Sequence, residues 1–164
     1  MRGKNHEQLN GPLPGGFTLV EMLTVVAIVG ILASMAIPLA RLGEQRMKER
    51  SLREGLREIR LAIDNYKRAG DEGRILRKAG TSGYPESLEV LVSGVDGVAT
   101  QSGRVYFLRR IPPDPFAPDD AASPGWGLRS YASPPTAPAA GDDVYDVYSL
   151  SGGMGSNGVA YRQW

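Results

Sequence analysis

The apolar positions of this 164-residue chain gather in one uninterrupted run close to its beginning. No charged residue lies between Glu21 and Arg41, and most of the residues between them are apolar. At 1.5 Å per residue, a helix of about twenty residues spans roughly the hydrocarbon core of a bilayer. The run therefore predicts a helix over residues 17–42 that is inserted in a membrane at some stage.

Beyond this run the apolar pattern narrows to a single stripe with helical spacing. The stripe predicts that the helix continues to about Ala69, with Gly70 as its end, which gives one helix of some fifty residues. A short coiled-coil seam has the same spacing, but five positions favour packing against a domain. On the polar face, opposite charges four residues apart are expected to pair. The stripe consists of Leu52, Leu56, Ile59, Ile63 and Tyr66, and the charge pairs are Glu44 with Lys48, Glu49 with Arg53 and Asp64 with Arg68.

Short apolar segments separated by Gly, Pro and Ser make up the rest of the chain. Tyr84-Pro85 is expected to open a short helix with Leu88, Leu91 and Val92 on one side. Three β-prone segments predict an antiparallel meander, and a sheet so small needs the amphipathic helix against one face. These segments are residues 128–132, 144–150 and 159–164. The pattern predicts an α+β fold in which a long N-terminal helix packs on a small antiparallel sheet of about three strands.

Composition limits the chemistry that the chain can perform. It has no Cys, and its single His is His6, which lies ahead of the apolar run. Without Cys there are no disulfides, thiolate metal sites or cysteine nucleophiles, and a chain that lacks residues 1–16 has no histidine for a Ser-His-Asp triad. Acidic residues are interspersed among the basic ones, which argues against a nucleic-acid surface. We expect a protein that is not an enzyme, with no cofactor and no nucleic-acid partner.

The residues before the apolar run are polar and end in a pair of small residues. Gly15-Gly16 precedes Phe17, whereas a secretory signal peptide is cut after its apolar segment. Cleavage between Gly16 and Phe17 would leave the apolar helix on the mature protein. The alternative is an ordinary signal peptidase cut after Ala36, which would release a secreted enzyme or binding domain.

The sequence Gly-Phe-Thr-Leu-Val-Glu at residues 16–21, followed by an apolar helix, resembles the type III signal of type IV pilins and type II secretion pseudopilins. The resemblance implies a type IV pilin-like fold, cleavage between Gly16 and Phe17 by a prepilin peptidase, and N-methylation of Phe17. It also implies that Glu21 contacts the N-terminus of a neighbouring subunit during assembly. A carboxylate within an apolar helix marks a functional site by default, although Glu21 also fits simple snorkelling to the lipid headgroups.

Gly30 and Pro38 are the weak points of the apolar helix. Glycine lowers helix stability and proline deletes one backbone hydrogen bond, so the helix can bend or partly unwind near these residues. In the families that the chain resembles, local melting at a proline in this place accompanies the packing of subunits into a filament. An ordinary kink in a membrane helix is the alternative interpretation.

Further segments narrow the resemblance to the major, G-type pseudopilins of type II secretion systems. They are Gly83-Tyr84-Pro85, the Arg-Ile-Pro-Pro-Asp-Pro-Phe sequence at residues 110–116, Tyr145-Asp146-Val147-Tyr148-Ser149 and Trp164. The resemblance implies that copies of the chain form a helical homopolymer, a pseudopilus that drives protein export across the outer membrane. The implied partners are minor pseudopilins, the prepilin peptidase, and an inner-membrane assembly platform with its ATPase, since the chain has no Walker motif. A type IV pilin or minor pilin in adhesion, motility or DNA uptake is the alternative with the same fold.

The same resemblance implies a location. The precursor is expected to be a single-pass inner-membrane protein with a cytoplasmic N-terminus and a periplasmic domain at residues 43–164. Removal of the leader, residues 1–16, then allows mature subunits to join a periplasmic filament. Arg2 and Lys4 agree with this orientation, whereas four basic residues beyond the apolar run favour the opposite one. Those four are Arg41, Arg46, Lys48 and Arg50.

The loop at residues 151–158 departs from the major pseudopilins, which hold a calcium ion between their last two strands with several Asp or Glu oxygens. Here the loop reads Ser-Gly-Gly-Met-Gly-Ser-Asn-Gly and contains no carboxylate. Calcium takes six to eight oxygen ligands, and Ser151, Ser156 and Asn157 supply neutral oxygens only. We therefore expect weak or absent calcium binding. Three earlier carboxylates are closer to a solvated acidic turn and strand than to a site: Asp142, Asp143 and Asp146.

Overall fold

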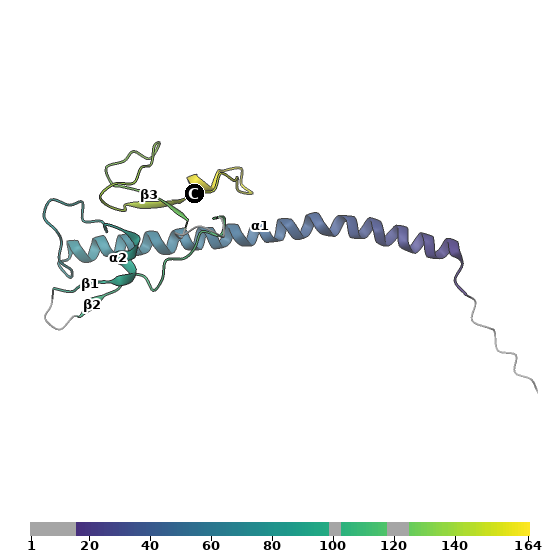
Figure 1. Ribbon diagram of the computed structural model, residues 1–164, viewed down its shortest axis with the longest axis horizontal. Helices are drawn as coiled ribbons and strands as arrows, with labels where there is room; N and C mark the ends of the chain where they lie inside the picture. Colours follow the sequence, from purple (N-terminus) through teal and green to yellow (C-terminus); the bar gives the residue numbers. More distant parts are fainter. Residues whose placement is uncertain (1–15, 99–102, 118–124) are drawn as a thin grey trace, which may run out of the picture. The chain divides into compact units, whose positions relative to one another are not determined.

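The computed structural model describes residues 16–98, 103–117 and 125–164 (Figure 1). The elements in chain order are α1 (Leu19–Asp71), α2 (Leu88–Ser93), β1 (Val95–Asp96), β2 (Arg104–Val105), β3 (Trp126–Arg129), β4 (Asp146–Ser149) and the 3-10 helix η1 (Tyr161–Gln163). The chain divides after Leu42 into two compact units, and the second of them, residues 43–164, is the globular unit. The long N-terminal helix and small antiparallel sheets confirm the predicted α+β, pilin-like class.

α1 begins with a side-chain cap that the sequence analysis did not identify. The hydroxyl of Thr18 accepts a hydrogen bond from the backbone N–H of Glu21 at 3.2 Å, and the N–H of Met22 bonds to the Thr18 carbonyl at 3.1 Å. The Thr-x-x-Glu spacing is that of a capping box, which satisfies N–H groups left open at a helix start. Glu21 therefore also places a negative charge at the positive end of the helix dipole.

α1 ends at Asp71, two residues before its capping glycine, which is Gly73 and not Gly70. Gly70 is helical, and Gly73 adopts the left-handed conformation with φ 68°. The N–H of Gly73 bonds to the carbonyl of Gly70 at 3.1 Å, and the N–H of Arg74 bonds to that of Ala69 at 2.8 Å. This pair of bonds is a Schellman motif, whose glycine must tolerate a positive φ. The predicted end at Gly70 is wrong because the motif needs its glycine past the last helical turn.

The second half of α1 forms one wall of the core, as its apolar stripe predicts. Leu52, Leu56, Ile59 and Ile63 are all buried, and Tyr66 packs partly buried beside them. The core is completed by Ala62 of α1 and by residues from α2, β3, β4, the connecting segments and η1: Leu88, Leu91, Leu108, Trp126, Val144, Val147 and Tyr161. The stripe is therefore a packing surface for this domain, and the alternative of a coiled-coil seam is not needed to explain it.

Within the described ranges, four short strands form two separate antiparallel pairs. β1 pairs with β2, and β3 pairs with β4 in a register that sets Trp126 opposite Ser149 and Arg129 opposite Asp146. The predicted third strand at residues 159–164 is wrong, because that segment has one isolated bridge and then turns into η1. In a strand, Val159 and Tyr161 would share a face, but Val159 is exposed whereas Tyr161 is buried.

α2 begins later than predicted. Pro85 does not open the helix; it is buried, and its carbonyl accepts a hydrogen bond from the N–H of Val144 at 2.8 Å. That bond holds the Tyr84-Pro85 segment beside the chain leading into β4, so that Ser87 becomes the N-cap residue of α2. Leu88 and Leu91 are buried as expected.

A search of the described residues for helices long and apolar enough to cross a bilayer finds none.

Candidate functional site

The apolar half of α1 is the candidate assembly surface. Its large apolar side chains are more than half exposed, from 51% for Met22 and Val25 to 76% for Leu19. They occupy neighbouring positions and so cover every face of the helix, a pattern typical of a helix that another surface surrounds. Among the described side chains, the set comprises Phe17, which immediately precedes the helix, and ten helical residues: Leu19, Val20, Met22, Leu23, Val25, Val26, Ile28, Val29, Ile31 and Leu32.

The polar side chains of the helical segment 19–34 are few, and two of the three bond to their own helix. Thr24 Oγ1 donates to the Val20 carbonyl at 2.8 Å, and Ser34 Oγ donates to the Ile31 carbonyl at 2.7 Å. Such local bonds hide hydroxyls from an apolar neighbour. Among the described residues, the carboxylate of Glu21 makes no comparable hydrogen bond or ion pair. The contact predicted between Glu21 and a neighbouring subunit stays a prediction.

The predicted cleavage and methylation positions lie immediately before the helix. Gly16 and Phe17 are exposed and precede the N-cap residue Thr18, and Phe17 has 74% of its surface accessible. A peptide bond in this non-helical, exposed place is open to a peptidase without unfolding the helix. The cleavage and methylation predicted at Gly16 and Phe17 stay predictions.

Gly30 and Pro38, the other two predicted assembly residues, both lie within α1. The helix is assigned without interruption through both positions. A Cβ added at Gly30 would meet no atom of the described residues within 4 Å, so no close contact among them requires a glycine there. The predicted local unwinding near these residues stays a prediction about the assembled state.

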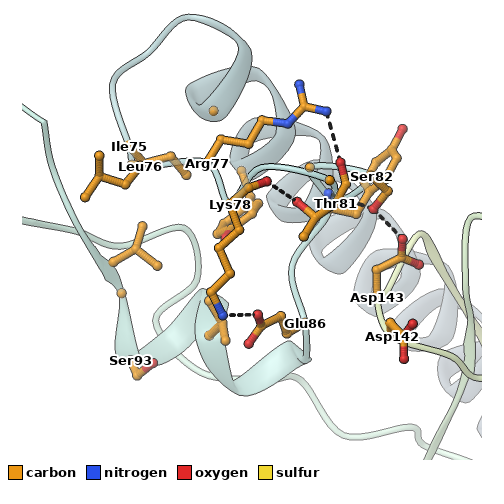
Figure 2. Close-up of a pocket in the computed structure, with 18 residues that line it drawn as sticks. Ile75, Leu76, Arg77, Lys78, Thr81, Ser82, Glu86, Ser93, Asp142 and Asp143 are labelled. Atoms are coloured by element: carbon orange, nitrogen blue, oxygen red, sulfur yellow. Dashed lines mark hydrogen bonds and ion pairs between the residues drawn. The ribbon is translucent and has the colours of Figure 1, made fainter.

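The globular unit contains a hollow of about 490 Å³ between α2, the segment that follows α1 and the turn before β4 (Figure 2). Its walls are held by their own polar pairs. Lys78 forms an ion pair with Glu86, and Arg77 Nη2 donates to the Thr81 carbonyl at 3.1 Å. The contact with Glu86 is the main cause that raises the pKa of Lys78. A strongly basic, already paired lysine is a poor nucleophile or base. The polar side chains that line the hollow therefore serve to hold its walls together.

The carboxylates considered for calcium are separated and used elsewhere. Asp143, which Figure 2 shows pointing toward Ser82, accepts hydrogen bonds from the Ser82 hydroxyl and from the Tyr131 N–H. Asp146 lies 2.7 Å from Arg60 Nε, and Asp142 is exposed at the hollow. Within the described part of the chain, no three His, Cys, Asp or Glu side chains gather in a way that could hold a metal ion.

Glu49 is a buried carboxylate that the sequence analysis assigned to the wrong partner. It does not pair with Arg53; only 2% of it is exposed, and it accepts hydrogen bonds from Ser156, Tyr161 and Gln45. Its pKa is lowered, chiefly by the hydrogen bond from the Ser156 hydroxyl, although burial acts in the opposite direction. The signal that identifies it is its phase: Glu49 precedes Leu52 by three residues and so continues the apolar stripe.

Arg60 ties the same helix to the last part of the chain. Its Nε donates to Asp146 Oδ1 at 2.7 Å, and its Nη2 donates to the carbonyl oxygens of Val147 and Trp164 at 3.1 and 2.8 Å. Two turns earlier, the guanidinium of Arg53 lies 4.3 Å from the centre of the Trp164 ring. The second half of α1 thus holds β4 and the C-terminal segment through charged groups as well as through the core.

Of the other two expected charge pairs, one forms. Lys48 lies 3.0 Å from Glu44, and both side chains are largely exposed. Arg68 instead donates to the side chain of Asn65 at 3.4 Å. Pairs of this kind on an exposed helix face contribute only about 0.3–0.5 kcal/mol. The replacement of the expected pair by the bond to Asn65 therefore changes the stability of the helix very little.

Comparisons with known proteins agree with the N-terminal signal and extend over about two thirds of the chain. Residues 15–37 match the family described as Prokaryotic N-terminal methylation motif. The chain is 30% identical over 118 residues to Type II secretion system core protein G of Klebsiella pneumoniae, which covers 67% of this chain and 75% of that protein. The protein of the same name from Aeromonas hydrophila is 30% identical over 118 residues, covering 67% and 73%. That of Pectobacterium carotovorum subsp. carotovorum is 28% identical over 122 residues, covering 71% of each. Comparison with solved structures gives no match.

Proposed function

The chain belongs to the family of type II secretion system core protein G and is a structural subunit of the pseudopilus, and from this premise we propose how it is processed and assembled. Prepilin peptidase cuts between Gly16 and Phe17, the new amine of Phe17 is methylated, and the mature subunits polymerise through the first half of α1. The observation that supports this most strongly is the apolar half-helix, whose side chains find no cover within their own unit.

Before assembly, the precursor resides in the inner membrane with its N-terminus in the cytoplasm and residues 43–164 in the periplasm. The lipid covers the apolar half of α1 at that stage, and neighbouring subunits cover it in the filament. Exchange of lipid for protein gains little hydrophobic free energy, because both are apolar. Specific polar contacts must then direct assembly, and Glu21 is the charged group on this surface that is available for one. Its partner would be the amine of Phe17 in a neighbouring copy.

The subunit's partners are, first, other copies of itself. The remaining partners follow from membership in a secretion machine: minor pseudopilins, prepilin peptidase, an inner-membrane platform and its ATPase. The chain itself performs no catalysis in this scheme, and the ATPase supplies the work, since the sequence has no Walker motif for nucleotide binding. The filament then drives folded proteins across the outer membrane.

Neither earlier alternative is supported by a particular observation. A pilin in adhesion or motility would share the fold, but the similar proteins carry the name of a secretion component. A secreted domain released after Ala36 would require a cut inside α1, which runs without a break from Leu19 to Asp71.

The mature N-terminus tests the proposal directly. The full chain is expressed with its secretion machinery, and mass spectrometry is applied to the membrane and filament fractions. We expect a species that begins with methylated Phe17, and a Gly16→Leu variant that keeps its leader and forms no filament. A mature chain that begins at Ile37, or filaments built from the uncut Gly16→Leu variant, would contradict the proposal.

A further inference from the structure

The oxygens of the 151–158 loop do not fit a calcium ion. Ser151 Oγ and Asn157 Oδ1 each accept a hydrogen bond from the backbone N–H two residues further on, at 3.2 and 3.1 Å. The hydroxyl of Ser156 donates to Glu49 at 2.6 Å. Since calcium takes six to eight oxygens, a loop that offers three neutral side-chain oxygens, each already engaged in a hydrogen bond, is a poor cation site.

The loop instead presents hydrogen-bond donors to Glu49 on α1. The N–H of Ser156 lies 2.8 Å from Glu49 Oε1, and its hydroxyl lies 2.6 Å from Oε2. The hydroxyl of Tyr161 donates at 3.2 Å and the amide of Gln45 at 3.1 Å. All four groups are donors, and together they satisfy both oxygens of the buried carboxylate. The polarity of the site is therefore that of an anion site filled by a side chain of the same protein.

We propose that Glu49 performs the task of a metal ion in this chain: the carboxylate on α1 holds the 151–158 loop and Tyr161 in place, and the domain closes without divalent cations. A buried carboxylate is costly unless donors satisfy it, and hydrogen bonds to a charged group are stronger than those between neutral groups. The contact is also long-range, since Glu49 and Ser156 are 107 positions apart. The inference does not depend on the filament role, because it concerns only the fold of the globular unit.

Hydrogen exchange of the full mature chain in detergent micelles tests the proposal. The amides of residues 153–161 should exchange at the same rate in EDTA and in millimolar calcium chloride. In Glu49→Gln, an amide faces two donors of Ser156, and the same amides should exchange at least about tenfold faster, the effect of losing one hydrogen bond to a charged group. Glu44→Gln, one turn earlier on the exposed face, should leave the loop unchanged.

Two results would overturn the proposal. One is slower exchange or a higher melting temperature of the unaltered chain when calcium is added. The other is loop exchange in Glu49→Gln that equals that in Glu44→Gln.

A milder pair of variants keeps the test open if Glu49→Gln does not fold. Ser156→Ala removes one donor but leaves the backbone N–H to Glu49, whereas Ser151→Ala removes an acceptor used only inside the loop. Loop exchange should rise more in Ser156→Ala than in Ser151→Ala, and addition of calcium should restore neither. The reverse order, or rescue by calcium, would contradict the role assigned to Glu49.

Discussion

The two halves of α1 carry apolar residues in opposite arrangements. In the first half they occupy nearly every position and remain exposed, as Ile28 does with 53% of its surface accessible. In the second half they recur every three or four residues and are buried, as Ile59 is with 0%. The same secondary structure thus supplies a surface for other molecules and a wall for its own core. The spacing of apolar residues, more than their number, decides which of the two results.

The two halves also use a carboxylate differently. Glu21 is exposed and lacks a side-chain partner within the described part of the chain, whereas Glu49 is buried and accepts hydrogen bonds from three residues. A charge on an apolar surface gains its partner only on assembly. A charge in a core position must have its partners within the fold. Substitutions matched between the halves should therefore separate assembly from stability.

The largest difference is expected from a matched pair of isoleucines. Ile59→Ala removes a fully buried side chain from the core and should lower the free energy of unfolding of the globular unit by about 2–5 kcal/mol. Ile28→Ala should change it by less than about 0.5 kcal/mol, the range of surface substitutions. Urea unfolding in detergent, followed by tryptophan fluorescence, measures both. Equal losses would show that the first half of α1 also stabilises the domain.

Two arginines on the second half provide the next comparison. Arg60→Met removes the bonds to Asp146, Val147 and Trp164 and should cost about 1–3 kcal/mol of unfolding free energy. Arg57, one turn earlier, is exposed and makes no hydrogen bond or ion pair with any residue in the described ranges. Arg57→Met should therefore change stability by less than about 0.5 kcal/mol. A similar loss in both variants would mean that the bonds of Arg60 add nothing beyond its apolar stem.

Glu21→Gln should act on assembly alone. Loss of the charge removes the proposed contact with the amine of Phe17, and we expect the yield of sedimentable filaments to fall by about tenfold, equivalent to about 1.4 kcal/mol. The melting temperature of the globular unit should not change. Thr24→Val, which removes a hydroxyl bonded only to its own helix, should assemble normally. Normal filament yield from Glu21→Gln would exclude a charge-directed contact.

The smallest effect is a dependence on pH that belongs to Glu49. Hydrogen bonds, first that from the Ser156 hydroxyl, lower the pKa of Glu49, so its ionised form is favoured in the folded state. A carboxylate with a lowered pKa adds stability above its ordinary value of about 4.3, and this stability is lost as the pH falls. The stability difference between the unaltered chain and Glu49→Gln should then be constant above about pH 5 and shrink below about pH 4.

Taking this difference removes the contributions of the other acids. Tyr161 also faces Glu49, but burial raises the pKa of its hydroxyl from a value already near 10, far from the acidic range. Chemical denaturation at several pH values provides the measurement. A difference that stays constant down to pH 3 would show that the pKa of Glu49 is the same in the folded and the unfolded chain.

Long periodic features could be predicted from the sequence because many residues contribute to each. The uninterrupted run and the stripe at Leu52 to Tyr66 both lie in α1, and the Gly-Phe signal falls within the matched family motif. The paired strands β1 and β2 have two residues each, too few to leave any periodic pattern. Their position depends on Gly94, which has φ 75° and whose added Cβ would lie 2.9 Å from the Val105 carbonyl oxygen. This close approach depends on the tertiary structure, so it could not be predicted from the local sequence.

The candidate site was predictable to a different degree. Gly16, Phe17 and Glu21 could be named from a local motif, although their roles in assembly stay predictions. The burial of Glu49 was not predicted, because a charged residue in line with the apolar stripe was interpreted as part of an exposed ion pair. Its partner Ser156 lies in a glycine-rich loop that has no periodic pattern. The error at residues 159–164 has the same cause, since the buried Tyr161 follows from contacts that no local window contains.

The ties between α1 and the end of the described chain also constrain the order of events during synthesis. Ser156 follows Glu49 by 107 positions, and Trp164 follows Arg60 by 104. At the usual pace of translation, the helix leaves the ribosome about 5–20 s before its partners exist. During that interval the stripe from Leu52 to Ile63 lacks its core partners from β4 and η1, Val147 and Tyr161. A nascent subunit is therefore most vulnerable to aggregation and proteolysis in the second half of α1. Any factor that shields this segment must act before β4 emerges from the ribosome.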